Sequence, residues 1–219
     1  MNKKLTLLMA ILLLTPMAAS AKMGLGLKAG AIRNSTDLLM LMPVGSPNYT
    51  GEYEQNNGIY GGEVFYETDG LWRWGVRLGL ELNPKSTYDE DNNGAVSKYT
   101  YKTMYIPATA YYKYAPEDSA FNFWAGGGVS FMKVTYTSLG STSDYTQNKI
   151  VPHLDAGTEW NMSKHFGLGL NLGYLFGAKF DDLRNADDSR ALMYDTPGNS
   201  PMSVNNEGLR GDISLRYYF

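Results

Sequence analysis

The feature that most constrains the fold is a strict alternation of apolar residues with small or polar ones. It is clearest between positions 72 and 83, where Trp72, Trp74, Val76, Leu78, Leu80 and Leu82 alternate with Arg73, Gly75, Arg77, Gly79, Glu81 and Asn83. Successive side chains of a strand point to opposite faces, so this segment predicts a strand with one apolar and one polar face. A helix would repeat its apolar positions every three or four residues instead.

The same alternation occurs in eight segments, which are 23–32, 58–67, 72–83, 100–114, 121–133, 150–160, 166–177 and 210–219. Each is close to the length of about 9–11 residues that a tilted transmembrane strand needs. The connections alternate between short (68–71, 115–120 and 161–165) and long (33–57, 84–97, 134–149 and 178–206). An even number of strands, with short turns at one end and long loops at the other, is typical of bacterial outer-membrane barrels.

The N-terminus has the features of an export signal. Lys3 and Lys4 precede an apolar stretch at 5–14, and Ala19-Ser20-Ala21 is a small-x-small cleavage site. We therefore predict a signal peptide at 1–21 and one domain at 22–219. The predicted fold is all-β, an eight-stranded antiparallel up-and-down transmembrane β-barrel in the cell outer membrane of a Gram-negative bacterium.

Composition agrees with this location. The chain has no cysteine, so we expect neither disulfides nor the lipid anchor of a lipoprotein. Its net charge of −3 and the lack of a basic run argue against nucleic acid as a partner. No second long apolar stretch is present, and a chain that crosses a membrane without helices must form a closed barrel.

A soluble β-sandwich is the alternative fold, because it could share the 24 glycines and 17 tyrosines. The distribution of aromatic residues favours the barrel. Most of those expected to face outward gather beside the short turns and the C-terminus, as in an aromatic belt at a membrane interface. They are Tyr66, Trp72, Trp74, Tyr112, Tyr114, Phe121, Phe123, Trp160, Phe166, Tyr217 and Phe219. Tyr60, Phe131, Tyr174 and Phe176 could form a thinner belt at the other interface.

Several segments resemble those of a known family. Tyr105-Ile-Pro-Ala-Thr-Ala-Tyr-Tyr-Lys-Tyr114, Phe123-Trp-Ala-Gly-Gly-Gly128 and Leu154-Asp-Ala-Gly-Thr-Glu159 are similar to strands of small outer-membrane barrels common in Bacteroidetes, called porin-family or PorT-like proteins. The overall pattern also resembles the transmembrane domains of OmpA and OmpX. The C-terminal residues Ile213, Leu215, Tyr217 and Phe219 resemble the assembly signal of such barrels. The resemblance implies the barrel-assembly machinery as a partner and carries no shared catalytic motif.

Charged residues are predicted on the inward faces. An eight-stranded barrel has room inside only for side chains. The predicted lumen network contains five cations and six anions, namely Lys28, Arg73, Arg77, Arg210 and Arg216 with Glu63, Glu67, Glu81, Asp155, Glu159 and Asp212. This near balance predicts a plug of ion pairs rather than an ion-selective pore, which would favour an excess of one sign.

Histidine offers the one candidate for catalysis. Some eight-stranded barrels modify lipid A with a histidine, a serine and an acid near the outer surface. His165 falls in a short turn on the opposite side, whereas His153 shares an inward face with Asp155 and could act as an oriented base. The sequence indicates no serine partner, so we interpret His153 as a polar lumen residue.

Three loop segments could each be either a binding site or an ordinary loop. Residues 89–94 match the opening of a calcium loop, but Thr100 stands where the bidentate glutamate is required, so we expect a hydrated loop tip and no metal. Asp181, Asp182, Asp187 and Asp188 form an acidic patch that could bind divalent cations or simply be solvated. The apolar stretch 38–44 could be a contact site, but we expect it to pack.

Together these patterns predict a structural or interaction barrel that displays long extracellular loops, has a lumen plugged by charges, and is not an enzyme. The alternatives are a lipid A-modifying enzyme and a narrow channel for small hydrophobic solutes. We expect no cofactor. The expected partners are outer-membrane lipid and lipopolysaccharide, the assembly machinery, and an unidentified extracellular or envelope protein.

Overall fold

The computed structural model describes residues 21–40, 49–92, 95–138, 144–191 and 203–219, and side chains in these ranges except 34–40, 49–56, 85–92, 95–99 and 138. The described chain forms ten strands: β1 (Lys22–Met40), β2 (Tyr49–Glu67), β3 (Trp72–Asn92), β4 (Ala95–Tyr114), β5 (Phe121–Ser138), β6 (Asp144–Asn161), β7 (Phe166–Leu175), β8 (Lys179–Phe180), β9 (Val204–Asn205) and β10 (Gly208–Tyr218). Within these ranges no helix is long and apolar enough to span a membrane.

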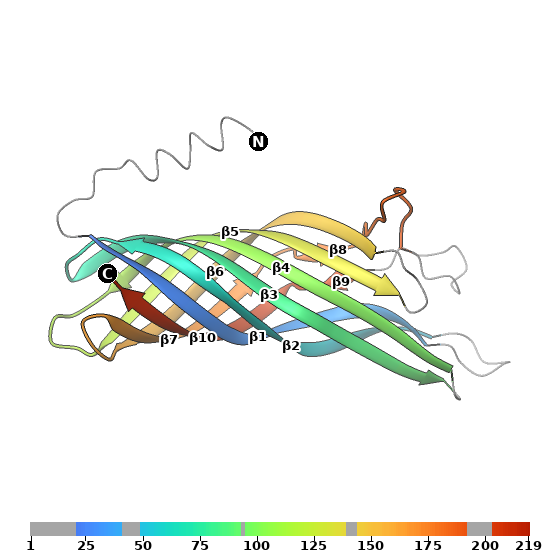
Figure 1. The fold of residues 1–219 in the computed structure, drawn as a ribbon, viewed down its shortest axis with the longest axis horizontal. Coiled ribbons are helices and arrows are strands. Elements are labelled where there is room, and N and C mark those ends of the chain that lie inside the picture. Colours follow the sequence, from blue (N-terminus) through green and yellow to red (C-terminus); the bar gives the residue numbers. More distant parts are fainter. Residues whose placement is uncertain (1–20, 41–48, 93–94, 139–143, 192–202) are drawn as a thin grey trace.

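Eight of these strands close into a barrel (Figure 1). β1 to β7 pair antiparallel in chain order, and β10 pairs with β7. β10 also pairs with β1, from Gly24 opposite Tyr218 to Ile32 opposite Arg210, which leaves no free edge at this level. The predicted fold, an eight-stranded antiparallel up-and-down barrel, is confirmed.

The alternation in sequence becomes an alternation in burial. Along β7 and β10 every second side chain is buried in the barrel and the others are exposed. Leu27, Leu170 and Leu172 are among the large apolar side chains that are more than half exposed on the outer surface. An apolar surface of this extent is suited to lipid rather than to water.

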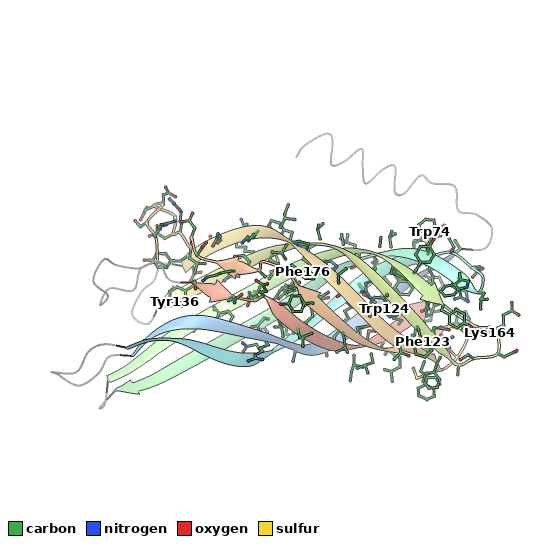
Figure 2. The ribbon with its side chains drawn as sticks, turned by 180° about the vertical axis from the view of Figure 1, so that it is seen from behind. Trp74, Phe123, Trp124, Tyr136, Lys164 and Phe176 are labelled. Carbon is green, nitrogen blue, oxygen red and sulfur yellow. The ribbon has the colours of Figure 1, made fainter. Side chains whose placement is uncertain are left out.

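Both aromatic and turn positions agree with the sequence interpretation. The short turn after β2 contains Gly70, whose φ of 109° is a conformation that favours glycine. Around this end of the barrel the outward rings contact one another, as in the pairs Trp72–Tyr114 and Phe121–Trp160. In Figure 2, Trp74 and Phe123 lie at the end with the short turns, Phe176 lies about midway, and Tyr136 lies toward the opposite end.

The strands are longer than the sequence analysis predicts. β1 to β6 span 18 to 21 residues each, because much of the predicted long loops 33–57, 84–97 and 134–149 is paired as strand. These segments are rich in Thr, Tyr and polar residues, so they pair outside the membrane without the apolar alternation that marks the lower strands. Three hairpins therefore extend beyond the lipid-facing surface (Figure 1).

The fourth long connection, between β7 and β10, behaves differently. It contains the two short strands β8 and β9, and β9 pairs with β1 at Ser35–Asn205 and Thr36–Val204. Ala178, Phe180 and Leu183 from this connection are buried against inward side chains of the barrel. The apolar residues of this connection therefore pack into the barrel, while Asp187, Asp188 and Ser189 of the same connection are exposed.

Candidate functional site

The barrel lumen is the candidate site, because the charged residues of the chain converge there. All eleven residues of the predicted network lie on inward faces, and all but Arg73 are buried. They come from β1, β2, β3, β6 and β10. Three further inward side chains of β4, Thr109, Tyr111 and Lys113, were not among them.

Lys113 is the charged residue that the sequence analysis missed. Its Nζ lies 3.1 Å from Glu67 Oε2 and 2.8 Å from Glu159 Oε1, and its side chain is 1% exposed. Tyr112 and Tyr114 point outward, so the same alternation that placed the other residues would have placed Lys113 inside. With Lys113 the inward cations equal the inward anions in number.

The ion pairs form a continuous chain that begins near the short turns. Arg73 contacts Glu67 at 3.1 Å, and Glu67 contacts Lys113. Lys113 contacts Glu159, which in turn lies 2.6 Å from Arg216. The hydroxyl of Tyr218 adds a hydrogen bond to Glu159. Opposite charges therefore alternate from contact to contact.

Arg216 continues the series of ion pairs toward the middle of the barrel. Its Nε lies 2.8 Å from Glu63, which also lies 3.1 Å from Lys28. Lys28 then reaches Glu81 at 3.1 Å. Arg216 and Lys28 therefore each bind two carboxylates from different strands, and Arg216 on β10 joins β2 to β6 across the lumen.

The series of ion pairs ends in two arginines that bind the same carboxylate. Arg210 lies 3.0 Å from Glu81 and 2.9 Å from Asp155, and Arg77 lies 3.0 Å from Asp155. The guanidinium of Arg77 also stacks on the ring of Trp124, with 3.9 Å between its central carbon and the ring centroid. Trp124 lies inside the barrel (Figure 2), so the ring and the carboxylate fix Arg77 from two directions.

Asp212 is held differently from the other acids of the network. Among the described residues it has no ion-pair partner within 4 Å, but Asn171 Nδ2 donates a hydrogen bond to it at 2.5 Å. Asn171 also donates to Ser214 at 3.2 Å. We refer to the twelve inward charges, Asp212 and Lys113 included, as the ionic layer.

His153 lies beside the ionic layer and has a serine neighbour that the sequence analysis did not find. Its Nδ1 lies 3.0 Å from Ser130 Oγ, and its Nε2 lies 2.9 Å from Thr109 Oγ1 and 3.4 Å from Asp155 Oδ2. Ser130 is on the neighbouring strand, where Val151, two residues before His153, is its partner. Ser130 is fully buried and His153 is 2% exposed, so no substrate can reach this group in the structure.

An apolar layer fills the lumen toward the outer end, above the ionic layer. It consists of Ile32, Ile59, Tyr101, Tyr105, Met132, Val134, Tyr136, Val151, Leu175, Ala178, Phe180, Leu183, Ala191 and Val204. Five of these belong to the β7–β10 connection. No pattern in the sequence predicts this layer, because the periodicity of a strand does not show that a loop will fold into its barrel.

Hydrogen bonds hold the β7–β10 connection against β6. Thr146 and Arg184 exchange backbone hydrogen bonds of 2.7 and 3.1 Å. The backbone N–H of Asp182 donates to the side chain of Gln147 at 3.0 Å, and Lys149 Nζ donates to the carbonyl of Lys179 at 2.9 Å. These bonds seat the apolar residues of the connection over the lumen.

The acidic patch of this connection is partly neutralised from within. Asp182 pairs with Arg190 and with Arg184, and Arg184 also lies 3.0 Å from Asp188. Hydrogen bonds from Arg190 and Arg184 hold the pKa of Asp182 below its usual range. In the described part of the chain no group of three or more acidic, His or Cys side chains is arranged to hold a metal. The side chains at 38–44 and 89–94 lie outside the described residues.

The four residues of the predicted assembly signal share the outward face of β10. Ile213, Leu215, Tyr217 and Phe219 are all exposed, and Phe219 is 70% exposed at the end of the strand. The backbone N–H of Phe219 donates to the carbonyl of Met23 at 3.0 Å, so the last residue helps to close the barrel. Their recognition by assembly machinery stays a prediction.

This closed barrel, with an apolar outer face and a charged interior, defines the class as a transmembrane β-barrel. The sequence profile of the outer membrane protein beta-barrel domain matches residues 5–196. The chain belongs to this family and is an outer-membrane protein. The narrower resemblance to PorT-like barrels stays a prediction.

Solved barrels of similar shape share little sequence with the chain. Ail, the attachment invasion locus protein of Yersinia pestis, is 12% identical with a TM-score of 0.46, and the match covers 91% of this chain and 99% of Ail. OprG from Pseudomonas aeruginosa is 14% identical with a TM-score of 0.45, and the match covers 91% of this chain and 98% of OprG. Neisserial surface protein A is 12% identical with a TM-score of 0.42, and the match covers 89% of this chain and 97% of that protein. No curated protein sequence matches the chain.

Proposed function

We propose that the protein is a structural and interaction barrel with a closed lumen, which holds long hairpins outside the outer membrane. The observation that carries this proposal is the continuous chain of ion pairs from Arg73 to Arg77. Every member except Arg73 is buried and has an oppositely charged neighbour within 3.1 Å. An interior of this kind braces the walls of a barrel.

The energetics of the ionic layer argue against steady ion flow. An ion entering the lumen must displace a partner from a residue such as Arg210 or Glu81. Removing one partner of a buried ion pair costs about 3–5 kcal/mol, because the other charge is left uncompensated. The apolar layer above is a second barrier, since its side chains are buried and most of them cannot replace the water around an ion.

The two alternative functions have less support. Catalysis would need His153 and Ser130 to reach a lipid, yet both are buried between the ionic and apolar layers. A channel for hydrophobic solutes would be favoured by the apolar layer alone. The ionic layer beneath it closes the same path with charged groups, so we favour the closed barrel.

Electrophysiology tests the proposal. Purified protein in planar bilayers should give no long-lived conductance steps, and brief small openings are all that a rearranging network allows. Arg210→Ala, which removes one of the two cationic partners of both Glu81 and Asp155, should increase the frequency of openings if it folds. Stable porin-sized steps from the unmodified protein would overturn the closed lumen and favour a channel.

We also propose that phosphate groups of outer-leaflet lipids, lipopolysaccharide included, bind between β4 and β5. Lys102 and Lys133 are exposed on the outer face, just beyond the apolar Met104 and Phe131. The register pairs Lys133 with Met104, so the two lysines are diagonal neighbours. Neither has an acidic partner among the described side chains, and adjacent like charges are unfavourable without a counter-ion.

Lipid selectivity tests this partner. Native mass spectrometry of Lys102→Gln/Lys133→Gln should show fewer bound molecules of lipid A and of anionic phospholipid than the unmodified protein. Lys164→Gln, in a turn at the opposite end, should change neither. Equal retention by the double variant would contradict the assignment, and loss of only one lipid class would identify the source of the phosphate.

A further inference from the structure

A polar cavity lies at the end of the lumen beside the short turns. Its volume is about 380 Å³, and Arg73 and Tyr218 are among the residues that line it. Lys113 Nζ donates to the hydroxyl of Tyr218 at 3.0 Å, and this hydroxyl donates to Glu159, so the cavity meets the ionic layer at its floor. The short turns of outer-membrane barrels face the periplasm. We call this space the lower cavity, and solutes of the periplasm can reach it.

Three cations line the lower cavity. Arg73 is partly exposed, unlike the rest of the ionic layer, and gives two of its donors to Glu67 and to a backbone carbonyl. Lys22 lies 3.9 Å from Asp69, and their side chains are 40% and 39% exposed, so this pair is weak. Lys164 is exposed at the end of the barrel (Figure 2) and forms no ion pair with a described side chain. Positive charge is therefore available to a ligand.

Two acids line the same cavity from the turn between β4 and β5. Glu117 and Asp118 are exposed, and neither is within 4 Å of a cation among the described side chains. Hydrogen bonds hold this turn in shape, since the N–H of Ser119 donates to Pro116 at 3.2 Å and its Oγ accepts from the N–H of Phe121 at 3.0 Å. The acids therefore stay apart from Lys164, although one cavity contains all three groups.

An amide adds a neutral donor to this site. Asn161 lines the lower cavity, and its Oδ1 accepts a hydrogen bond from Asn122 Nδ2 at 3.1 Å. Its backbone N–H donates to the carbonyl of Ala120 at 2.7 Å, which fixes the position of the residue. In the described part of the chain Asn161 Nδ2 has no acceptor, so it can donate to a ligand.

A second hollow adjoins the lower cavity. It has a volume of about 480 Å³, is lined by Leu71 and Pro116, and shares Glu117, Asp118 and Ser119 with the lower cavity. Its apolar residues could contact small apolar side chains of a ligand whose charged groups occupy the lower cavity. Cations, acids, an amide and an apolar hollow within a few residues of one turn are suited to a peptide.

We propose that the lower cavity binds a short peptide that has a free amine and free carboxylates. The three cations and Asn161 Nδ2 receive the carboxylates, and Glu117 and Asp118 receive the amine, through charge-assisted hydrogen bonds. Three cations against two acids favour a peptide of net charge −1. A simple anion, or the C-terminus of a protein, would leave both acids without a partner.

Binding of defined peptides to the protein in phosphatidylcholine nanodiscs tests the inference. The probe is the tripeptide Ala-Glu-Ala, and isothermal titration calorimetry measures its affinity. N-acetyl-Ala-Glu-Ala lacks the amine and Ala-Gln-Ala amide lacks the carboxylates, so each should bind about tenfold more weakly. Equal affinity for Ala-Glu-Ala and its acetylated form would overturn recognition of the amine, in favour of a protein C-terminus. The absence of saturable binding of Ala-Glu-Ala would overturn the site.

Variants of exposed residues locate the site without disturbing the fold. Lys164→Gln should weaken binding of Ala-Glu-Ala about tenfold, whereas Lys179→Gln, exposed near the opposite end, should leave it unchanged. Glu117→Gln/Asp118→Asn should weaken binding of Ala-Glu-Ala but not of its acetylated form, which has no amine to lose. Equal affinities in Lys164→Gln and Lys179→Gln would refute the lower cavity as the site. None of these outcomes depends on conductance, so the peptide site and the closed lumen can fail separately.

Discussion

Arg210 Nη1 lies 3.0 Å from Glu81 Oε2, although 129 positions separate the two residues in the chain. The same guanidinium group places Nη2 2.9 Å from Asp155 Oδ1. One side chain on β10 therefore joins β3 and β6 across the lumen. No pattern within a single strand indicates this contact, and its removal is the most direct test of the ionic layer.

Arg210→Ala should destabilise the barrel by about 3–5 kcal/mol, because two buried carboxylates lose a partner. Urea unfolding from lipid vesicles, followed by tryptophan fluorescence, measures the loss. Lys164→Ala removes an exposed cation from a turn and should have little effect. Equal unfolding midpoints for both variants would show that the ionic layer does not brace the barrel.

Gly173→Ala should also destabilise the barrel, by about 1–3 kcal/mol through overpacking. A Cβ at this inward position would meet Asp155 Oδ1 and lie 2.8 Å from Arg210 Nε. Gly211→Ala on the next strand is the matched control, since its Cβ would make only an ordinary contact, 3.4 Å from Leu172. The difference in unfolding free energy between the two alanine variants is the measurement, and its absence would contradict tight packing around Asp155.

Leu80→Arg should cost about 2–4 kcal/mol in a bilayer, since Leu80 is exposed on the lipid face midway along the spanning part of β3. Leu80→Ile keeps the face apolar and serves as the control. Gly79→Arg should act differently, because an inward Cβ there already lies 3.0 Å from Pro107 Cγ. Unchanged stability of Leu80→Arg in lipid, with a loss in Gly79→Arg, would place the membrane at another level of the barrel.

Deletion of Phe219 should lower the amount of folded protein in cells, if the last residues of β10 are read during assembly. Phe121→Ala is the control, because Phe121 is an exposed belt residue at the same end of the barrel. Heat-modifiable migration on SDS gels measures the folded fraction in membranes. Equal folded yields for the two variants would assign Phe219 to the belt alone.

The carboxyl group of Asp182 should titrate below its usual range, since the ionised form accepts hydrogen bonds from Arg190 and Arg184. It therefore stays charged at a pH where an ordinary aspartate begins to protonate, and the contact is lost as the pH falls through the lowered pKa. Carbon-13 NMR titration of labelled aspartate follows this group. In Arg184→Gln/Arg190→Gln the pKa should rise toward its normal value, and an unchanged value would exclude the arginines as the cause.

Local sequence determined the barrel and its faces. Alternation along 72–83 and 210–219 is sufficient to identify strands and to separate lipid-facing from inward residues, because strand geometry imposes a period of two. The same rule would have included Lys113. Short turns such as 68–71 also follow from sequence, since they depend on a few adjacent residues.

Only the tertiary structure decided which charges meet, how far the hairpins extend and where the last connection folds. The contact between Arg210 and Glu81 depends on barrel closure and strand register, and Ser130 reaches His153 only because β5 and β6 are neighbours. The β7–β10 connection folds inward because Phe180 and Leu183 find apolar partners on other strands. The period of a strand fixes the face on which a residue lies, whereas its contacts are set by closure of the whole sheet.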